Sequence, residues 1–148
     1  MSTEPSGSDA IRPYRTSDRD QVIELWNACG LTRPWNDPAA DIQRSLDTAT
    51  SELFIQQEAD RIIGTLMVGY DGHRGWMYYL AADPAQRGKG IAKALVAVAE
   101  DFLRDQGCPK VELMVRTTNT AALGFYDRLG YEAQEVTVRA KWLNGNTQ

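Results

Sequence analysis

Basic and glycine residues alternate in the segment Arg87-Gly88-Lys89-Gly90, directly before a run of apolar residues at helical spacing. The first backbone N–H groups of a helix have no partner within the helix, and the aligned peptide dipoles make that end partly positive. Glycines let an anion approach these N–H groups, and the basic side chains add positive charge. The segment therefore predicts a phosphate or pyrophosphate site. The alternative is a tight strand-to-helix turn whose Arg and Lys are only solvated.

Two common phosphate motifs do not fit this segment. The dinucleotide fingerprint Gly-x-Gly-x-x-Gly/Ala would need glycine or alanine at the position of Lys93. A Walker A loop needs Ser or Thr after its Gly-Lys pair, but Gly90 follows Lys89. If the segment binds phosphate, it does so as a different kind of loop.

The elements around the segment indicate an α/β fold with a mixed sheet. We expect an antiparallel hairpin at 52–70, a strand at 76–82 before the basic segment, and a helix after it that ends near Gly107. Strands come first in antiparallel pairs and later alternate with helices, so helices are expected on both faces of the sheet. The remaining expected elements are strands at 10–14 and 110–116, helices at 16–29, 36–49 and 119–130, and one or two final strands in 131–143.

The composition is that of one globular domain, with 148 residues and a net charge of -4. We expect the domain to span residues 10–148, after a disordered tail at 1–9. The acidic balance argues against nucleic acid as a partner, and no stretch is apolar enough for a membrane span or a signal peptide. Cys29 and Cys108 lack the spacing of a metal site or a disulfide framework, so we expect no metal and a cytoplasmic protein.

The basic segment resembles the acyl-CoA loop Q/R-x-x-G-x-G/A of the GCN5-related N-acetyltransferase (GNAT) superfamily, with Arg87, Gly90 and Ala92 in the defining places. A second signature of that superfamily, N-x-x-A-x-x-x-Y-x-x-x-G-[FY], is similar to the segment 119–131. Its matching residues are Asn119, Ala122, Tyr126, Gly130 and Tyr131. Segments at 31–42, 69–80 and 107–113 also resemble the bacterial YpeA-type acetyltransferases.

The resemblance implies a single-domain GNAT fold, with about six or seven strands and about four helices, and acetyl-CoA as acyl donor. Tyr126 would be the general acid that protonates the leaving thiolate, or else a core partner of Phe125. Asn119 would bind the cofactor, or only cap the last helix. The backbone of Leu80 and Ala82 would pair with the pantetheine arm. The pyrophosphate would be held by the loop residues Arg87, Gly88, Lys89, Gly90, Ile91 and Ala92.

The base that deprotonates the amine is less evident from the sequence. Some members of the superfamily carry a glutamate early in the strand before the loop, but positions 76–79 hold no carboxylate. Asp71 and His73 are candidates, although Asp-Gly-His is also an ordinary turn. Glu112 is a third candidate. Trp35 lies where the family places acceptor-binding residues, or else it anchors its loop.

The sequence as a whole predicts an acyl-CoA-dependent N-acyltransferase that moves an acetyl group to a primary amine by direct attack. The alternative is a module that binds or senses acyl-CoA without turnover. The expected partner is an amine acceptor, small molecule or protein, and a homodimer is left open. The sequence does not identify the acceptor.

Overall fold

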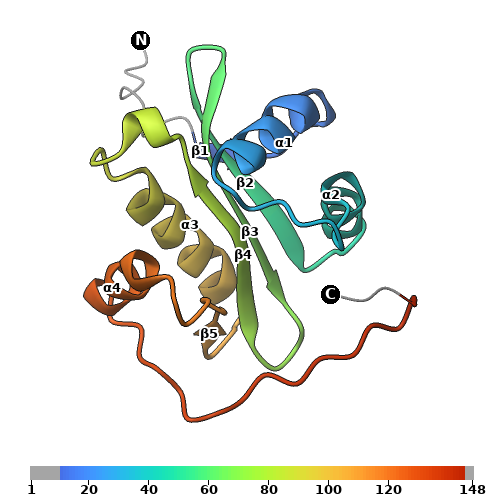
Figure 1. Ribbon diagram of the computed structural model, residues 1–148, viewed down its shortest axis with the longest axis vertical. Helices are drawn as coiled ribbons and strands as arrows, with labels where there is room; N and C mark the ends of the chain where they lie inside the picture. The colour runs from blue at the N-terminus through green and yellow to red at the C-terminus, as the bar shows by residue number, and fades with distance from the viewer. Residues whose placement is uncertain (1–10, 146–148) are drawn as a thin grey trace. The chain divides into compact units, whose positions relative to one another are not determined.

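The computed structural model describes residues 11–145, and the chain divides into two compact units, Met1–Glu112 and Leu113–Gln148 (Figure 1). The tail expected at 1–9 lies outside the described residues.

The first unit contains a five-stranded mixed sheet in the order β1-β2-β3-β4-β5. Neighbouring strands from β1 to β4 are antiparallel, and β5 is parallel to β4. The hairpin predicted at 52–70 is confirmed as β2 and β3, which turn at Ala59 and Asp60. The strands are β1 (Ile11–Pro13), β2 (Ser51–Glu58), β3 (Arg61–Tyr70), β4 (Gly75–Ala82) and β5 (Val111–Glu112).

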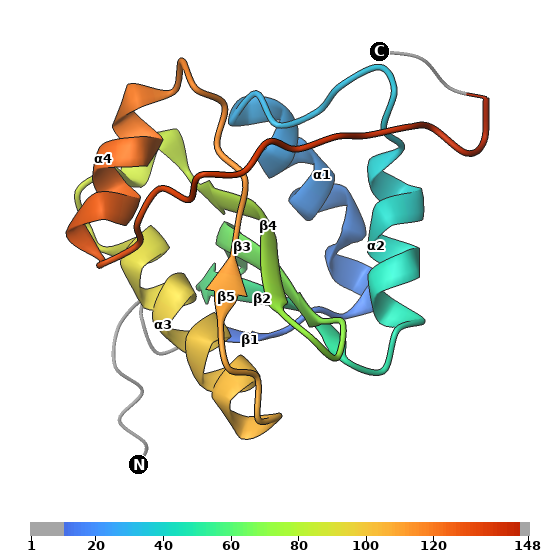
Figure 2. The ribbon, with the colours of Figure 1, turned by 90° about the horizontal axis from the view of Figure 1, so that it is seen from below.

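Helices cover both faces of this sheet, as the order of elements predicted. Figures 1 and 2 show α1 (Arg19–Ala28) and α2 (Pro38–Leu46) on one face and α3 (Ile91–Asp105) on the other. Asp37 caps α2, because its Oδ1 accepts a hydrogen bond of 3.2 Å from the backbone N–H of Ala40, and Pro38 occupies the first helical position. Two short 3₁₀ turns, Thr16–Asp18 and Pro84–Gln86, precede α1 and α3.

A glycine in β3 fixes how closely α3 approaches the sheet. A Cβ atom on Gly64 would lie 2.6 Å from Cγ2 of Ile91 and 2.9 Å from Cδ1 of Leu95, so only a residue without a side chain fits there. Ile91 and Leu95 are buried in the first turns of α3. Burial of these two side chains therefore holds the start of the helix against the sheet.

The second unit contains α4 (Thr120–Arg128). Asn119 caps this helix, because its Oδ1 accepts a hydrogen bond of 3.1 Å from the backbone N–H of Ala122. No strand occurs among the described residues 113–145. The prediction of six or seven strands was therefore wrong: the segment 110–116 pairs for only two residues, and 131–143 pairs for none. A strand is stabilised by its ladder, so apolar alternation alone does not make one.

None of the helices in the described part of the chain is both long enough and apolar enough to span a bilayer.

Candidate active site

A β-bulge interrupts the pairing of β4 with β3. Thr65 lies opposite Ala81 and Met67 lies opposite Tyr78, so two residues of β4, Tyr79 and Leu80, face the single residue between them on β3. Tyr79 adopts a left-handed conformation with φ of 55°. A bulge leaves its extra residue outside the ladder and turns side chains out of their normal alternation. The backbone of the strand is thus locally opened.

Three side chains hold the bulge in place. The Nε1–H of Trp26 donates a buried hydrogen bond of 2.8 Å to Oγ1 of Thr65. The Thr65 hydroxyl in turn donates a hydrogen bond of 2.9 Å to the backbone carbonyl of Tyr79. The rings of Trp26 and Tyr79 stack with centroids 3.8 Å apart. Because Trp26 and Thr65 are fully buried, the strained residue is fixed from inside the core.

The second half of β4 offers a free edge within the first unit. β5 pairs with β4 only at Gly75 and Trp76, so residues 77–82 have no strand partner on that side among residues 11–112. An unpaired edge presents backbone N–H and C=O groups that can bind an extended amide-containing ligand. Leu80 and Ala82, the predicted pantetheine-binding residues, both lie on this part of the strand.

The basic loop follows at the end of this edge. Gly88 and Gly90 have left-handed φ values of 83° and 75°, and a Cβ on either would meet no atom within 4 Å. Gly90 is the N-cap of α3 and makes no side-chain capping bond, so the N–H groups at this helix start receive no cap. Arg87 and Lys89 are exposed on either side. The predicted cradle is thus open and fits a phosphate-bearing group.

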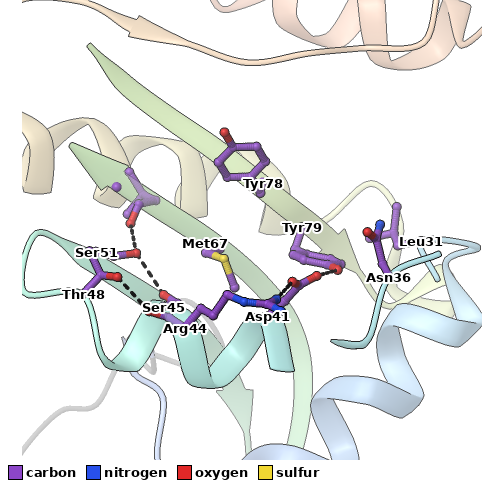
Figure 3. Close-up of a pocket in the computed structure, with 12 residues that line it drawn as sticks. Leu31, Asn36, Asp41, Arg44, Ser45, Thr48, Ser51, Met67, Tyr78 and Tyr79 are labelled. Atoms are coloured by element: carbon purple, nitrogen blue, oxygen red, sulfur yellow. Dashed lines mark hydrogen bonds and ion pairs between the residues drawn. The ribbon is translucent and has the colours of Figure 1, made fainter. Parts of the chain in front are cut away.

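A groove of about 550 Å³ opens on the other side of the bulge, between β4, β3 and α2 (Figure 3). Tyr78 and Tyr79 both line it, although neighbouring residues of a regular strand point to opposite faces. The bulge explains this, because it turns the Tyr79 side chain. The groove is also lined by Leu31, Asn36, Asp41, Arg44, Ser45, Thr48, Ser51, Met67, Val68 and Gly69.

A carboxylate from α2 lies in this groove against Tyr79. The Tyr79 hydroxyl donates a hydrogen bond of 2.6 Å to Oδ2 of Asp41, and Nη1 of Arg44 lies 2.8 Å from Oδ1 of the same carboxylate (Figure 3). Burial of the phenol, together with the negative charge of Asp41, raises the pKa of Tyr79. Tyr79 therefore stays protonated and keeps donating to Asp41.

Two of the three base candidates from the sequence, Asp71 and His73, lie in the turn between β3 and β4. Oδ1 of Asp71 accepts two hydrogen bonds, one of 2.8 Å from the backbone N–H of His73 and one of 2.7 Å from the backbone N–H of Arg74. These hydrogen bonds lower the pKa of Asp71. The contacts of Asp71 are those expected of the turn alternative. A role of either residue as the base stays a prediction.

Neither the acceptor-side candidate Trp35 nor the third base candidate Glu112 lines the groove. Trp35 lies in the loop between α1 and α2, partly buried, and is not among the groove residues. Glu112 in β5 lies 3.9 Å from Nε of Arg74, so its carboxylate is paired.

In the second unit, the local contacts of the two signature residues are those of the simpler alternatives, capping and packing. Asn119 caps α4, as its simpler interpretation predicted. Tyr126 packs edge-on against Phe125 and Tyr131, with ring centroids 5.0 and 5.5 Å away. Burial raises the pKa of Tyr126 to about 12, so the hydroxyl is protonated at neutral pH. A proton donor needs this state, but the role itself stays a prediction.

Sequence reasoning missed Asp41, Tyr79 and Thr65. Asp41 reads as an ordinary first-turn acid of α2, and Thr65 reads as one residue of an apolar strand. A signal for Tyr79 was present, since two adjacent tyrosines occur where the family strand approaches the loop. Only the bulge shows that both side chains reach one groove.

Fold and site together define a mixed α/β protein whose free strand edge leads into an open, glycine-lined helix start. The chain belongs to the acetyltransferase (GNAT) family, whose model matches residues 19–131. It is therefore an acyl-CoA-dependent N-acetyltransferase by class.

Curated relatives carry the same designation. An acetyltransferase of Sodalis glossinidius (strain morsitans) is 46% identical over 125 residues, which cover 84% of this chain and 88% of the relative. An acetyltransferase of Yersinia enterocolitica is 44% identical over 133 residues, which cover 90% of this chain and 94% of the relative.

Solved structures share the fold at lower identity. A transcriptional regulator from Bacillus halodurans C-125 superposes with a TM-score of 0.78 at 22% identity, covering 89% of this chain and 98% of that one. The aminoglycoside acetyltransferase AAC(6')-Iy, in complex with a bisubstrate analogue containing CoA, gives a TM-score of 0.76 at 19% identity, covering 89% and 96%. At these identities the likeness concerns the fold.

Proposed function

We propose that this protein moves an acetyl group from acetyl-CoA to a primary amine by direct attack of the amine on the thioester. The observation that carries the proposal is the continuous backbone surface from residue 77 of β4, through the bulge, to the uncapped start of α3. A long ligand with an amide-containing arm and a phosphate end fits such a surface. Bound acetyl-CoA would supply the activated thioester carbonyl.

The chain would hold that ligand mainly by its backbone. The N–H groups from Arg87 to Ala92 would bind the pyrophosphate, with the helix dipole and two exposed cations adding attraction. The backbone of Leu80 and Ala82, which has no strand partner on the β5 side within the first unit, would pair with the pantetheine amides, with the Ala82 carbonyl shared with the Cys29 thiol. Backbone donors at a rigid bulge can also stabilise charge on a carbonyl oxygen without reorganisation.

Direct attack is favoured because neither cysteine is set up as a nucleophile. The Cys29 thiol donates a hydrogen bond of 3.3 Å to the backbone carbonyl of Ala82. Burial raises the pKa of this thiol, so the reactive thiolate is disfavoured. The Cys108 thiol donates 3.3 Å to the carbonyl of Lys110.

The family resemblance assigns two further roles. Tyr126 would protonate the leaving thiolate, and its raised pKa keeps that proton in place at neutral pH. Asn119 would contact the cofactor in addition to capping α4. A cytoplasmic location, the YpeA-type relationship and a homodimer remain predictions.

The test is acetyl transfer by the purified protein. The protein is mixed with acetyl-CoA and single amines from a panel of peptides, polyamines and small amines, and released CoA is measured together with the acetylated product. We expect CoA release that depends on both substrates. Binding of acetyl-CoA without release for any amine would favour the non-catalytic sensing module, and failure to bind acetyl-CoA would overturn both.

A further inference from the structure

The groove beside the bulge has the composition of a site for a small organic amine. We propose that the acceptor is a monoamine with an apolar or aromatic body, and that Asp41 binds its ammonium group. This inference rests on the proposed function, since it names the substrate class of the same site.

The groove is coupled to the bulge through one residue. Tyr79 contributes its backbone to the bulge and its side chain to the groove, where its hydroxyl binds Asp41 at 2.6 Å. The stack on Trp26 prevents the ring from moving independently of the core. Asp41 is therefore held in a fixed position relative to the bulged backbone of β4, as a group that orients an attacking amine must be.

Asp41 has capacity left for a ligand. Each carboxylate oxygen can accept two hydrogen bonds, and each makes one, Oδ1 with Arg44 and Oδ2 with Tyr79. The Asp41 side chain is 26% exposed, so a ligand can reach it. Arg44 is 69% exposed, and such a surface pair is worth only about 0–1 kcal/mol. The pair with Arg44 therefore does not stop Asp41 from binding an ammonium.

The charges of the groove argue against a polycation. Among the residues that line it, Asp41 is the one acid and Arg44 is the one base, so the lining has no net charge. A second ammonium group would find no other carboxylate in the lining and would lie near the guanidinium, which repels it; Asp37, whose charge also acts on Tyr79, lies outside the lining. A single positive charge on the acceptor is thus the best match.

The serine and threonine hydroxyl groups of the groove donate hydrogen bonds within the protein. The Oγ atoms of Ser45 and Ser51 lie 2.9 Å apart, and Ser51 also donates to the carbonyl of Val68. The Thr48 hydroxyl donates 2.8 Å to the carbonyl of Arg44. Because these hydroxyl protons are already engaged, the three side chains can accept hydrogen bonds from a polyhydroxylated acceptor such as a sugar but offer it no donor.

The rest of the lining offers apolar contact. The Tyr78 ring is 45% exposed on β4, and Met67 and Leu31 lie beside the groove on β3 and on the loop after α1 (Figure 3). Ligand sites typically combine such apolar walls with a few polar groups in a volume of roughly 300–1,000 Å³. An aromatic ring on the acceptor would stack on or pack against Tyr78.

The test measures binding, so that it does not depend on turnover. 2-Phenylethylamine is titrated by calorimetry into the wild type and into Asp41→Asn, both saturated with CoA. Asparagine keeps the acceptor for Tyr79 but removes the charge. We expect the wild type to bind and Asp41→Asn to bind roughly tenfold or more weakly. The matched control is Asp47→Asn, at the end of the same helix and outside the groove lining, which should bind like the wild type.

Three further probes complete the design: 2-phenylethanol, which lacks the charge, and spermidine and kanamycin, which are polycations. Each should bind more weakly than 2-phenylethylamine. The proposal is overturned if the wild type does not bind 2-phenylethylamine, if Asp41→Asn binds it equally well, or if a polycation binds more tightly. Acetyl transfer to a polycation alone would overturn this inference and leave the proposed function standing.

Discussion

The aromatic rings of Trp26 and Tyr79 stack with an angle of 9° between their planes, which joins α1 to the bulge in β4. Trp26 is fully buried, and its one polar atom binds Thr65, which in turn binds the Tyr79 carbonyl. One indole therefore supports both the ring and the backbone of the strained residue.

Replacement of Trp26 by Phe should destabilise the fold. The substitution deletes the buried hydrogen bond to Thr65 and leaves a small cavity, which together should cost about 2–4 kcal/mol. Urea denaturation measures this loss. Trp76→Phe is the control, since its indole makes only an exposed bond of 3.3 Å to Asp71, and it should cost less than about 1 kcal/mol. Equal losses in both variants would show that Trp26 has no special role.

Replacement of Gly90 by Val should abolish acetyl-CoA binding while the fold survives. A Cβ at this position meets no protein atom within 4 Å, so the cost is mainly backbone strain of about 1–3 kcal/mol, but the side chain would stand where the pyrophosphate is proposed to bind. Ligand at 100 times its Kd should stabilise the wild type by about 2.7 kcal/mol, which a thermal shift detects. Gly107→Val is the matched control, because Gly107 is also left-handed and open but follows the other end of α3. Stabilisation of Gly90→Val equal to that of Gly107→Val would remove the loop from the site.

Deletion of the Tyr126 hydroxyl should lower turnover without changing folding. Tyr126→Phe keeps the ring contacts with Phe125 and Tyr131, so kcat should fall roughly 10²-fold while acetyl-CoA affinity is retained. Tyr131→Phe is the control, since the family signature accepts Phe at that position. Because the pKa of Tyr126 is raised to about 12, its deprotonation should not lower the rate as pH passes 10. An unchanged kcat in Tyr126→Phe, measured where chemistry limits the rate, would leave Tyr126 as a packing residue.

Acid should weaken the junction between β1 and the start of α1. Burial alone would raise the pKa of Asp18, but bonds from Arg12 at 2.8 and 2.9 Å and from the Arg15 backbone outweigh it and lower the pKa. A lowered folded-state pKa stabilises the protein above the ordinary value of 3.8, and this contribution is lost as pH falls through the folded-state value.

The variant Asp18→Asn tests this dependence. It should lose about 1.5–3 kcal/mol of stability at pH 7, and less as the pH approaches 2. Denaturation across this pH range measures both. Asp20→Asn is the control, because Asp20 is exposed and lies 3.5 Å from Arg19. An Asp18→Asn loss that stays constant from pH 7 to pH 2 would contradict the assigned charge effect.

The sequence by itself determined the elements whose signals are local. Asp37 and Pro38 specify the start of α2, the apolar spacing after Gly90 specifies α3, and Asn119 specifies the start of α4. Gly88 and Gly90 both have positive φ, the conformation that glycine adopts more readily than any other residue. The family signatures rest on such short segments, which is why the fold class could be predicted and a phosphate cradle could be proposed.

Only the tertiary structure decided the features that depend on partners distant in the chain. The bulge at Tyr79 exists because β4 has two residues where β3 has one between the same two paired positions. Trp26, which lies 53 positions earlier in the chain, holds it in place. Asp41 became a groove residue because the bulge turned Tyr79 toward α2. The missing strands at 131–143 have the same cause: a ladder requires a pairing partner, and alternation within one segment cannot supply it.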